Sequence, residues 1–390
     1  MFKCASVYTY EIDDPEAAFE EVRAQLEERV TLLEHTVGII MCHPEFIGSG
    51  VLKHICGQLP FDLAGVTTSS QAVGDEAGEL ILTVFVMTSD DVWFRCGVTE
   101  GLDEFVDTPV KTAFDKAATG AVESPKLALI FPPRLQHAGD VYVNAWQKVI
   151  PDVPIFGALA VDDTLTFKES ETIYNGESYK NAMSFVLCYG NINPRFIVGT
   201  FPKDKVMPYK GEITKSDGPF VYEINNINAY RYFEDIGFTN NGVINENYIF
   251  VPFVIDQKKR ADYDGIPVIR RLASFTEDGT AVFRGYVDEG STFTMLTCGT
   301  EDVVTTTRQN VELVNNMPDV NGVLLFPCII RRMMIMRSNS LMELQVTRDS
   351  IRPGIPYMMG YACGEICPTL VKDSIPTNRY HNYSLIILVV

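Results

Sequence analysis

Three stretches of the chain repeat one order of elements, and this repeat constrains the fold more than any single motif does. Each stretch has an apolar strand, a helix, and a second apolar strand that runs into a glycine and a polar loop. The strands, helices and glycines are, in order, 37–42, 47–58 and Gly65, then 127–131, 139–150 and Gly157, then 323–326, 330–348 and Gly360. This order is typical of a βαβ unit with parallel strands.

The repeated units predict the fold class. Helices that alternate with apolar strands favour an α/β, mixed α+β architecture, in which layered mixed sheets are flanked by helices. In each unit, the strand before the helix should pair with the strand after it. Glycine at the exit of the second strand permits a positive φ or a close approach of two backbones. Ligands of open α/β sheets bind where loops leave the carboxyl ends of strands, so we expect a site at these loops.

The first helix has a recognisable start. Asp14 is a good N-cap residue, and Pro15 suits the first helical position. Further along, Phe19, Val22 and Leu26 recur at helical spacing in an otherwise acidic stretch. The sequence therefore predicts an amphipathic helix that begins after Asp14.

Composition and charge narrow the function classes. Of the 390 residues, 46% are apolar, and 32 Lys and Arg against 51 Asp and Glu give a net charge of −19. A field this negative opposes nucleic-acid binding. The N-terminal residues lack the apolar core of a signal peptide, and no apolar run approaches the roughly 20 residues that span a bilayer. We therefore expect a cytoplasmic protein without membrane insertion, whose nine cysteines are reduced thiols.

Familiar catalytic signatures, such as a phosphate-binding loop or a nucleophile elbow, are missing from the sequence. Three residues separate Cys363 from Cys367, not the two of a zinc hairpin, so we expect neither a metal nor a cofactor. An alternative function is a cysteine-dependent hydrolase or transferase, in which Cys328 or Cys363 is the nucleophile, His381 the base and Glu365 its orienting partner. The competing interpretation is a buried thiol and a hydrogen-bonded histidine.

Several polar residues follow the predicted strands and could bind a ligand. Asp162 and Asp163 could hold an ammonium group or a cation, although paired carboxylates are also ordinary turn residues. Arg331 could hold a carboxylate through two hydrogen bonds. A run of hydroxyl groups would suit a polar zwitterion, but it is also typical of a solvated loop. This run consists of Thr67, Thr68, Ser69 and Ser70.

Several motifs, in the right order, resemble those of the FIST family (F-box and intracellular signal transduction). They are PIFGALAVDD at 154–163, NG at 175–176, NAYRYFEDIG at 228–237, FPCIIR at 326–331, GEI at 364–366 and YHN at 380–382. The resemblance runs from about residue 36 to the last residue. The chain departs from the family at Ala158, where a second glycine is frequent, and at Ala362 and Cys363, where an aromatic residue is common.

The resemblance implies a sensory module with an N-terminal half at 1–224 and a C-terminal half at 225–390. The two halves would together bind a small molecule, an amino acid or a related metabolite. Because no residues remain for an output domain, the signal would pass to a separate partner protein. Together with the strand exits, the matched motifs predict the following ligand-binding residues: Thr67, Thr68, Ser69, Asp162, Asp163, Cys328, Arg331, Cys363, Glu365, His381 and Asn382.

The net charge adds an expectation about the ligand. At long range a free anion is repelled, whereas a zwitterion or a cation is repelled less. We therefore expect a zwitterionic or cationic ligand, whose ammonium group binds Asp162 and Asp163 while its carboxylate binds Arg331. Capture of this ligand between the halves would favour one of their arrangements.

Overall fold

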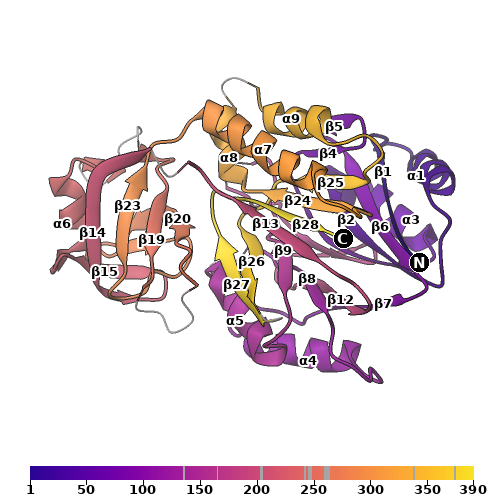
Figure 1. Cartoon of the computed structure of the whole chain (residues 1–390), viewed down its shortest axis with the longest axis horizontal. Coiled ribbons are helices and arrows are strands. Elements are labelled where there is room, and N and C mark those ends of the chain that lie inside the picture. Colours follow the sequence, from indigo (N-terminus) through magenta and orange to yellow (C-terminus); the bar gives the residue numbers. More distant parts are fainter. Residues whose placement is uncertain are drawn as a thin grey trace.

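The computed structural model describes residues 1–134, 137–164, 166–202, 205–240, 243–244, 248–258, 264–336, 339–372 and 375–390. In this part of the chain, three similar units form a body, and a β domain is inserted into the third unit (Figure 1). The units occupy 2–89, then 92–190, then 195–199 together with 300–389. The β domain occupies 206–296. The fold is therefore mixed α/β, as the alternation of helices and apolar strands predicts.

Each unit repeats one order: a strand, a helix, a strand, one or two helices, a strand, a hairpin and a last strand. The first unit contains β1 (Phe2–Thr9), α1 (Pro15–Arg29), β2 (His35–Cys42), α2 (Glu45–Gly48), α3 (Val51–Gln58), β3 (Asp62–Thr67), β4 (Gln71–Val73), β5 (Glu76–Gly78) and β6 (Leu82–Ser89). The second contains β7 (Val92–Val98), α4 (Asp107–Ala117), β8 (Leu127–Phe131), α5 (Gly139–Val149), β9 (Ile155–Ala158), β10 (Thr172–Tyr174), β11 (Glu177–Tyr179) and β12 (Ser184–Gly190). The third contains β13 (Arg195–Gly199), α7 (Thr300–Asn315), β24 (Val323–Pro327), α8 (Ile329–Ile335), α9 (Met342–Ser350), β25 (Tyr357–Gly360), β26 (Glu365–Lys372), β27 (Ile375–His381) and β28 (Leu385–Val389).

The predicted strand pairing is confirmed in all three units. β2 pairs in parallel with β3, β8 with β9, and β24 with β25. The single long helix expected at 330–348 is instead two helices, α8 and α9. The repeated order of elements in the sequence therefore corresponds to a real repeat of topology.

The hairpins link the units in a cycle. β4–β5 of the first unit pairs with β25 of the third, β10–β11 of the second with β3 of the first, and β26–β27 of the third with β9 of the second. The three sheets thus have the orders β1-β6-β2-β3-β10-β11, β7-β12-β8-β9-β26-β27 and β13-β28-β24-β25-β4-β5. Each unit therefore completes the sheet of another.

The inner faces of the three sheets meet in one shared core. Met41, Phe131 and Phe326 occupy equivalent positions in β2, β8 and β24, and all three are fully buried there. The helices cover the outer faces (Figure 1): α1 and α3 pack on the first sheet, α4 and α5 on the second, and α7 to α9 on the third.

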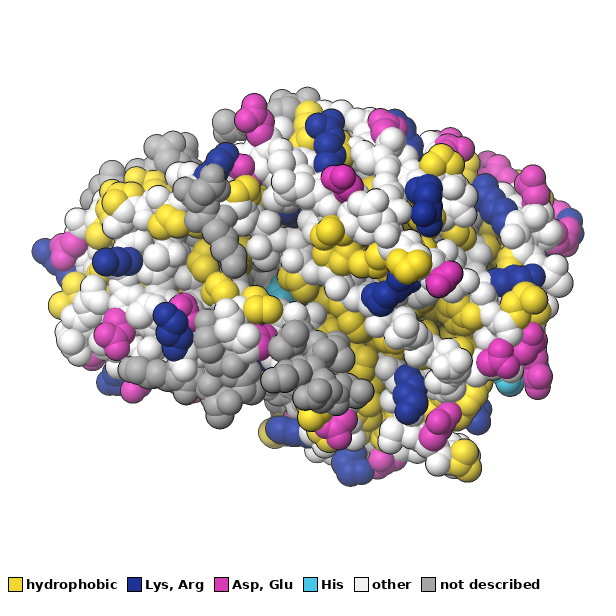
Figure 2. Space-filling view, viewed as in Figure 1, with side chains coloured by type: hydrophobic (Ala, Val, Ile, Leu, Met, Phe, Trp, Pro, Cys, Tyr) yellow, Lys and Arg dark blue, Asp and Glu magenta, His cyan; other side chains and the backbone are white. Residues whose placement is uncertain are grey.

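On the face in Figure 2, basic and acidic side chains are interspersed. Among the described helices, none is both long enough and apolar enough to cross a membrane.

The β domain is a strongly curved sheet. Its elements are β14 (Val206–Asp217), β15 (Phe220–Ile224), β16 (Ile227–Asn228), α6 (Ala229–Asp235), β17 (Thr239–Asn240), β18 (Val243–Ile244), β19 (Phe253–Asp256), β20 (Val268–Arg270), β21 (Leu272–Phe275), β22 (Ala281–Phe283) and β23 (Thr292–Leu296). The sheet order is β20-β19-β23-β14-β15-β22-β21. The two edge strands, β20 and β21, are separated in the chain only by Arg271, so the sheet curls into a nearly closed barrel. Phe233, Phe253 and Phe293 pack in its apolar interior.

Helix α1 begins as its sequence predicts. The Asp14 carboxylate accepts hydrogen bonds from the backbone nitrogens of Glu16 (3.0 Å) and Ala17 (3.1 Å), which have no partner inside the helix. Val22 and Leu26 are buried against the first sheet. Local capping and helical periodicity are thus sufficient to place this helix.

Gly65 and Gly157 occupy equivalent positions, where parallel strands approach closely. Gly65 lies opposite Ile40 and Gly157 opposite Ile130. A Cβ atom added to Gly65 would lie 1.7 Å from the carbonyl oxygen of Ile40, and one added to Gly157 would lie 1.9 Å from that of Ile130. These glycines are therefore required for close backbone approach, not for a positive φ.

Gly360 does not align with these two glycines. In the third unit Met359 lies opposite Leu325, the position equivalent to Gly65 and Gly157, and Gly360 follows one residue later. A Cβ atom added to Gly360 would instead lie 2.7 Å from the Met41 sulfur. The predicted alignment of the three glycines is wrong by one residue in the third unit, although the order of elements is the same.

We expect Gly157→Ala to lower the free energy of unfolding by about 3 kcal/mol or more, because the new methyl group collides with a backbone carbonyl. Gly57→Ala is the matched control. Gly57 lies in α3 with open space around its added Cβ, so alanine should stabilise the protein by about 0.5–1 kcal/mol. Urea denaturation measures both changes. An unfolding midpoint equal to that of the wild type in Gly157→Ala would contradict the close approach.

Candidate ligand-binding site

Three described arginine side chains converge on a small cavity between the β domain and the second and third units. Arg271 and Arg284 come from the β domain, and Arg134 comes from the second unit. The cavity has a volume of about 40 Å³, roughly the space of three ordered waters or of one carboxylate group. We call it the arginine pocket. Its described lining also includes Phe167, Cys328, Ile329, Ile330, Cys363, Gly364, Tyr380 and Asn382.

Short local contacts place each arginine. Arg271 lies between β20 and β21, where the barrel nearly closes, and its carbonyl oxygen accepts the backbone nitrogen of Arg284 at 2.8 Å. Arg134 follows β8 by three residues and donates to the carbonyl oxygen of Thr166 at 3.2 Å. Its guanidinium lies 4.9 Å from the ring centre of Phe167, a cation–π contact. The strand exit of the second unit and the closing point of the barrel thus supply the three cations.

A buried ion pair holds the β domain against the body beside this pocket. Arg270, at the end of β20, is 1% exposed, and its Nη2 lies 3.1 Å from a carboxylate oxygen of Asp140 in α5. Arg270 Nη1 also donates to the carbonyl oxygen of Tyr380 at 2.9 Å. The second carboxylate oxygen of Asp140 accepts the backbone nitrogen of Tyr286 at 2.8 Å. These bonds fix the position of Arg271 relative to Tyr380.

The pocket has positive charge without a compensating acid. No acidic side chain is among the described residues that line it. Arg284 is exposed as a whole residue, but partial desolvation by the surrounding protein, together with repulsion from Arg134, lowers its pKa below the ordinary range. Burial raises the pKa of Cys363 and so keeps it a neutral thiol, although Arg134 acts in the opposite direction. Because like charges repel, an anion between the three guanidinium groups would be favoured.

Tyr380 forms one wall of the arginine pocket, and its position explains why residues 139 and 364 are glycines. A Cβ atom added to Gly139 would lie 2.2 Å from its ring, and one added to Gly364 would lie 2.1 Å from its hydroxyl oxygen. Gly364 also has φ +119°, which disfavours any other residue. The glycine of the GEI motif is therefore required both by its backbone conformation and by the ring packed on it.

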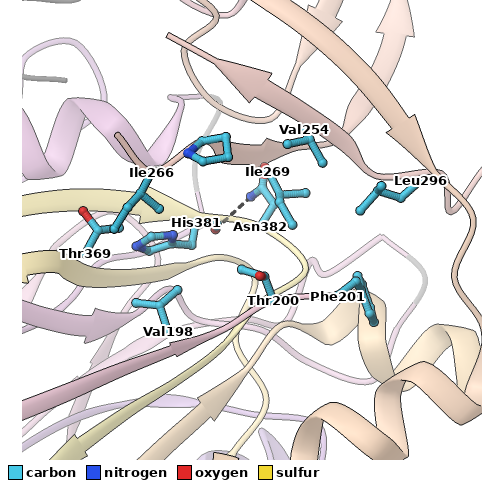
Figure 3. A pocket seen from close by; sticks show the side chains of 11 residues that line it. Val198, Thr200, Phe201, Val254, Ile266, Ile269, Leu296, Thr369, His381 and Asn382 are labelled. Atoms are coloured by element: carbon cyan, nitrogen blue, oxygen red, sulfur yellow. Dashed lines mark hydrogen bonds between the residues drawn. The ribbon is translucent and has the colours of Figure 1, made fainter. Parts of the chain in front are cut away.

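A second, larger cavity separates the β domain from the third unit, and we call it the interdomain cavity. Its volume is about 270 Å³. Figure 3 shows side chains from the β domain facing side chains from β13 and the end of β27 across this space. The apolar residues that face it include Val198, Phe201, Val254, Ile266, Ile269 and Leu296, and His381 and Asn382 add polar groups.

His381 is neutral in this cavity. Its Nε2 lies 2.9 Å from the carbonyl oxygen of Cys367, so this nitrogen carries the hydrogen and donates it. Burial lowers the pKa of His381 to about 4. The ring therefore adds polarity but no charge near neutral pH.

Glu365 is buried behind Cys328 of the arginine pocket. Its Oε2 accepts hydrogen bonds from the hydroxyl (2.6 Å) and the backbone nitrogen (3.3 Å) of Ser384, and Cys328 is also a hydrogen-bond partner. Its Oε1 is buried and has no hydrogen-bond partner in the described part of the chain. Burial raises the pKa of Glu365 to about 8. At neutral pH the side chain is therefore mostly protonated and does not neutralise the arginines.

Cys328, Cys363 and Asn382 are the predicted residues that line the arginine pocket, and His381 and Asn382 line the interdomain cavity. The hydroxyl run, which begins at the last residue of β3, lies elsewhere and is fully buried, not solvated. Thr67 exchanges hydrogen bonds with the backbone of Glu171, and Thr68 donates to the carbonyl oxygen of Tyr361 at 2.9 Å. These two residues join neighbouring units. Ser69 is buried beside them, and its hydroxyl has no partner in the described part.

The predicted charge clamp is not assembled. Asp162 is fully buried, and its two carboxylate oxygens accept the backbone nitrogens of Thr164 (2.6 Å) and Glu169 (2.8 Å). Asp163 is exposed and lies 3.4 Å from a ring nitrogen of His43. Asp162 therefore stabilises its own loop, and the structure places neither carboxylate in the lining of the two cavities.

Arg331 also has internal partners. It is fully buried, and its Nε donates to Glu343 at 2.8 Å, while its Nη2 donates to the hydroxyls of Thr306 (3.1 Å) and Thr307 (3.0 Å). This network joins α7, α8 and α9. Arg331 is thus structural in this arrangement, and the arginine pocket takes its cations from other residues.

The sequence matches two family models, the FIST N domain at residues 36–227 and the FIST C domain at 229–368. The chain belongs to the FIST family. FIST domains are generally sensory domains of signal transduction, which is the coarse function of this chain. A search of curated proteins finds no match. The boundary between the two FIST models lies in the β domain, and the division into halves at 224 and 225 stays a prediction.

The FIST motifs of the third unit converge on the two cavities. Gly364 lines the arginine pocket beside Tyr380, His381 lines the interdomain cavity, and Asn382 lines both. Cys328, from the FPCIIR motif, also lines the arginine pocket. These short motifs are far apart in the sequence, and the sheet brings their side chains to one place.

The cysteine mechanism gains no support from this geometry. Burial, with Glu365 nearby, raises the pKa of Cys328 well above its usual range, so the thiol stays protonated. His381 uses its Nε2 for the carbonyl oxygen of Cys367. A thiol nucleophile requires a base within hydrogen-bond reach, and in the described part of the chain no hydrogen bond joins a cysteine thiol to a histidine ring.

Sequence reasoning missed the three arginines. Arg134 was predictable, because it lies in the loop that leaves the strand at 127–131, and such loops are where we expected ligand-binding residues. Arg271 and Arg284 carry no such signal. Their position depends on the closure and docking of the β domain, which the sequence analysis did not predict.

The raised pKa of Glu365 predicts a pH-dependent stability. The unfolded chain has an ordinary carboxyl pKa near 4.5 and the folded protein about 8, so folding takes up a proton between these values. Stability should therefore fall as pH rises from about 4.5 to about 8. Glu365→Gln has no proton to lose at this position. As pH rises through this range, the free energy of unfolding of the variant should therefore exceed that of the wild type by a margin that grows by on the order of 3–5 kcal/mol.

Chemical denaturation at pH 5, 7 and 9 measures this difference. The lowered pKa of His381 acts in the opposite sense between about 6.5 and 4, but it is common to both proteins and cancels. Glu312→Gln, on the exposed side of α7, is the control and should keep the wild-type profile. A Glu365→Gln profile parallel to that of the wild type would show that Glu365 is ionised.

Proposed function

We propose that this FIST module senses a small carboxylate metabolite, an amino acid or a related compound, whose carboxylate binds in the arginine pocket. One observation carries the proposal: Arg134, Arg271 and Arg284 converge there, and no described lining residue is acidic. A carboxylate accepts charge-assisted hydrogen bonds from guanidinium groups in a planar, two-pronged geometry. It would also reduce the repulsion that lowers the pKa of Arg284.

The location of the pocket suggests how binding could be transmitted. Arg271 and Arg284 belong to the β domain, while Arg134, Cys363 and Tyr380 belong to the body. A ligand held by both parts favours the arrangement in which they are close, and it does so by its difference in affinity for the two arrangements. The recipient of the signal would be a separate protein that recognises this arrangement.

We place the module in the cytoplasm. All nine cysteines are unpaired, and six of them are buried. Free thiols suit a reducing compartment, because oxidising compartments favour disulfides.

A thermal-shift screen of a metabolite library is the first test, because a ligand that binds only the folded protein raises its melting temperature. We expect carboxylates to give the largest shifts. Calorimetry with the best of them should then show a loss of affinity of about 10- to 100-fold in Arg284→Ala, since one charge-assisted contact is lost.

Asp163→Asn is the matched control, because Asp163 is exposed and lies outside the described lining of both cavities. It should bind the ligand with wild-type affinity. Equal affinity of the wild type and Arg284→Ala would contradict a carboxylate in the arginine pocket. Loss of affinity in Asp163→Asn alone would favour the charge clamp that the sequence suggested.

A further inference from the structure

The described linings of the two cavities have one residue in common. Asn382 follows β27, and its side chain lines both the arginine pocket and the interdomain cavity. In Figure 3 its side chain lies in the interdomain cavity among residues of both the β domain and the third unit. A charged pocket of about 40 Å³ thus lies next to a larger cavity of about 270 Å³.

The side-chain oxygen of Asn382 is an unused acceptor. Asn382 is 5% exposed, and its Nδ2 donates to the carbonyl oxygen of His381 at 3.0 Å. Because that carbonyl requires a donor, the amide orientation is determined, and Oδ1 points away from it. Oδ1 is buried and has no hydrogen-bond partner in the described part of the chain. A buried acceptor without a partner is unfavourable, so a ligand that donates to it gains affinity.

The interdomain cavity suits an apolar group. Its lining includes the apolar side chains of Val254, Ile269 and Leu296 from the β domain, Val198 from the third unit and Phe201 from the segment that follows β13. No described lining residue is Asp, Glu, Lys or Arg, and His381 is neutral. The volume is roughly twice that of a cavity which holds one benzene ring, so an aromatic or branched side group fits.

We propose that the ligand of this module is a carboxylate with a hydrogen-bond donor beside the carboxylate and a large apolar side group. The carboxylate binds in the arginine pocket, the donor bonds to Asn382 Oδ1, and the side group fills the interdomain cavity. This inference rests on the proposed carboxylate-sensing function and adds the class of ligand. It also gives the ligand a second contact with both parts of the molecule, because the apolar group packs between the β domain and the third unit.

Calorimetry on the full chain tests this with three defined probes: lactate, phenyllactate and phenylpropanoate. The first two share the carboxylate and the hydroxyl donor and differ in the apolar group. Phenyllactate should bind about 10- to 100-fold more tightly than lactate, since burial of one large apolar side group contributes on that scale. Phenylpropanoate lacks the donor and should bind about tenfold more weakly than phenyllactate.

Two variants of the β domain locate the apolar group. Val254→Trp fills the interdomain cavity and should abolish the advantage of phenyllactate over lactate. Val282→Trp is the matched control, since Val282 on β22 is a partly buried valine outside the described lining of both cavities. It should keep the advantage. Arg284→Ala should weaken lactate and phenyllactate by a similar factor.

The outcomes separate this inference from the proposed function. Equal affinities for lactate and phenyllactate, both lowered in Arg284→Ala, would overturn the apolar subsite and leave carboxylate sensing in place. An advantage of phenyllactate that survives Val254→Trp would also overturn it, because the side group then binds elsewhere. Equal affinity of phenylpropanoate and phenyllactate would overturn the role of Asn382. Binding that does not depend on Arg284 would overturn both proposals. No binding of any of the three probes would overturn this inference, and the library screen then decides on carboxylate sensing.

Discussion

The geometry of both cavities depends on the buried ion pair of Arg270 and Asp140. Moving two charges out of water is costly, and the cost is offset only when the remaining donors and acceptors are also paired. Arg270 meets this condition: its Nε donates to Tyr286, its Nη1 to Ile269 and Tyr380, and its Nη2 to Asp140. Because all three nitrogens of the Arg270 guanidinium are hydrogen-bonded, this group holds the β domain in one orientation on the body. Arg271, the next residue, therefore faces the pocket.

The three units of the body are alike in topology but not in their surroundings. In each unit, the segment that leaves the second parallel strand is hydrogen-bonded to the end of the first. The equivalent backbone bonds run from the nitrogens of Thr68, Ala160 and Ala362 to the carbonyl oxygens of Cys42, Pro132 and Pro327, respectively. The β domain is inserted between β13 and α7 and packs on the exits of the second and third units. Arg134 and Cys363 therefore lie beneath it. The candidate site therefore lies where the inserted β domain makes the surroundings of the second and third units differ from those of the first.

The net charge of −19 does not decide the charge inside the arginine pocket. Charge of the whole molecule governs the long-range field, which salt screens over about 8 Å at physiological ionic strength. Binding depends on the few groups inside that distance, and around Cys363 these include Arg134, Arg271 and Arg284. The expectation of a zwitterionic or cationic ligand, held by Asp162, Asp163 and Arg331, started from the global charge, and the class of ligand stays a prediction. The structure assigns Asp162 and Arg331 to internal hydrogen bonds.

By itself, the sequence determined what depends on neighbouring residues: the cap at Asp14, the three βαβ units, and the place of glycines such as Gly157. Capping, periodicity and backbone sterics act over a few residues, so local patterns are enough to predict them. Even part of the candidate site was predictable, because strand exits pointed to Cys363 and motif resemblance to Asn382. Only the tertiary structure decided the exchange of hairpins, the protonation of Glu365 and the meeting of Arg134 with Arg284. These depend on burial and on contacts between segments far apart in the chain, which leave no periodic signal in the sequence.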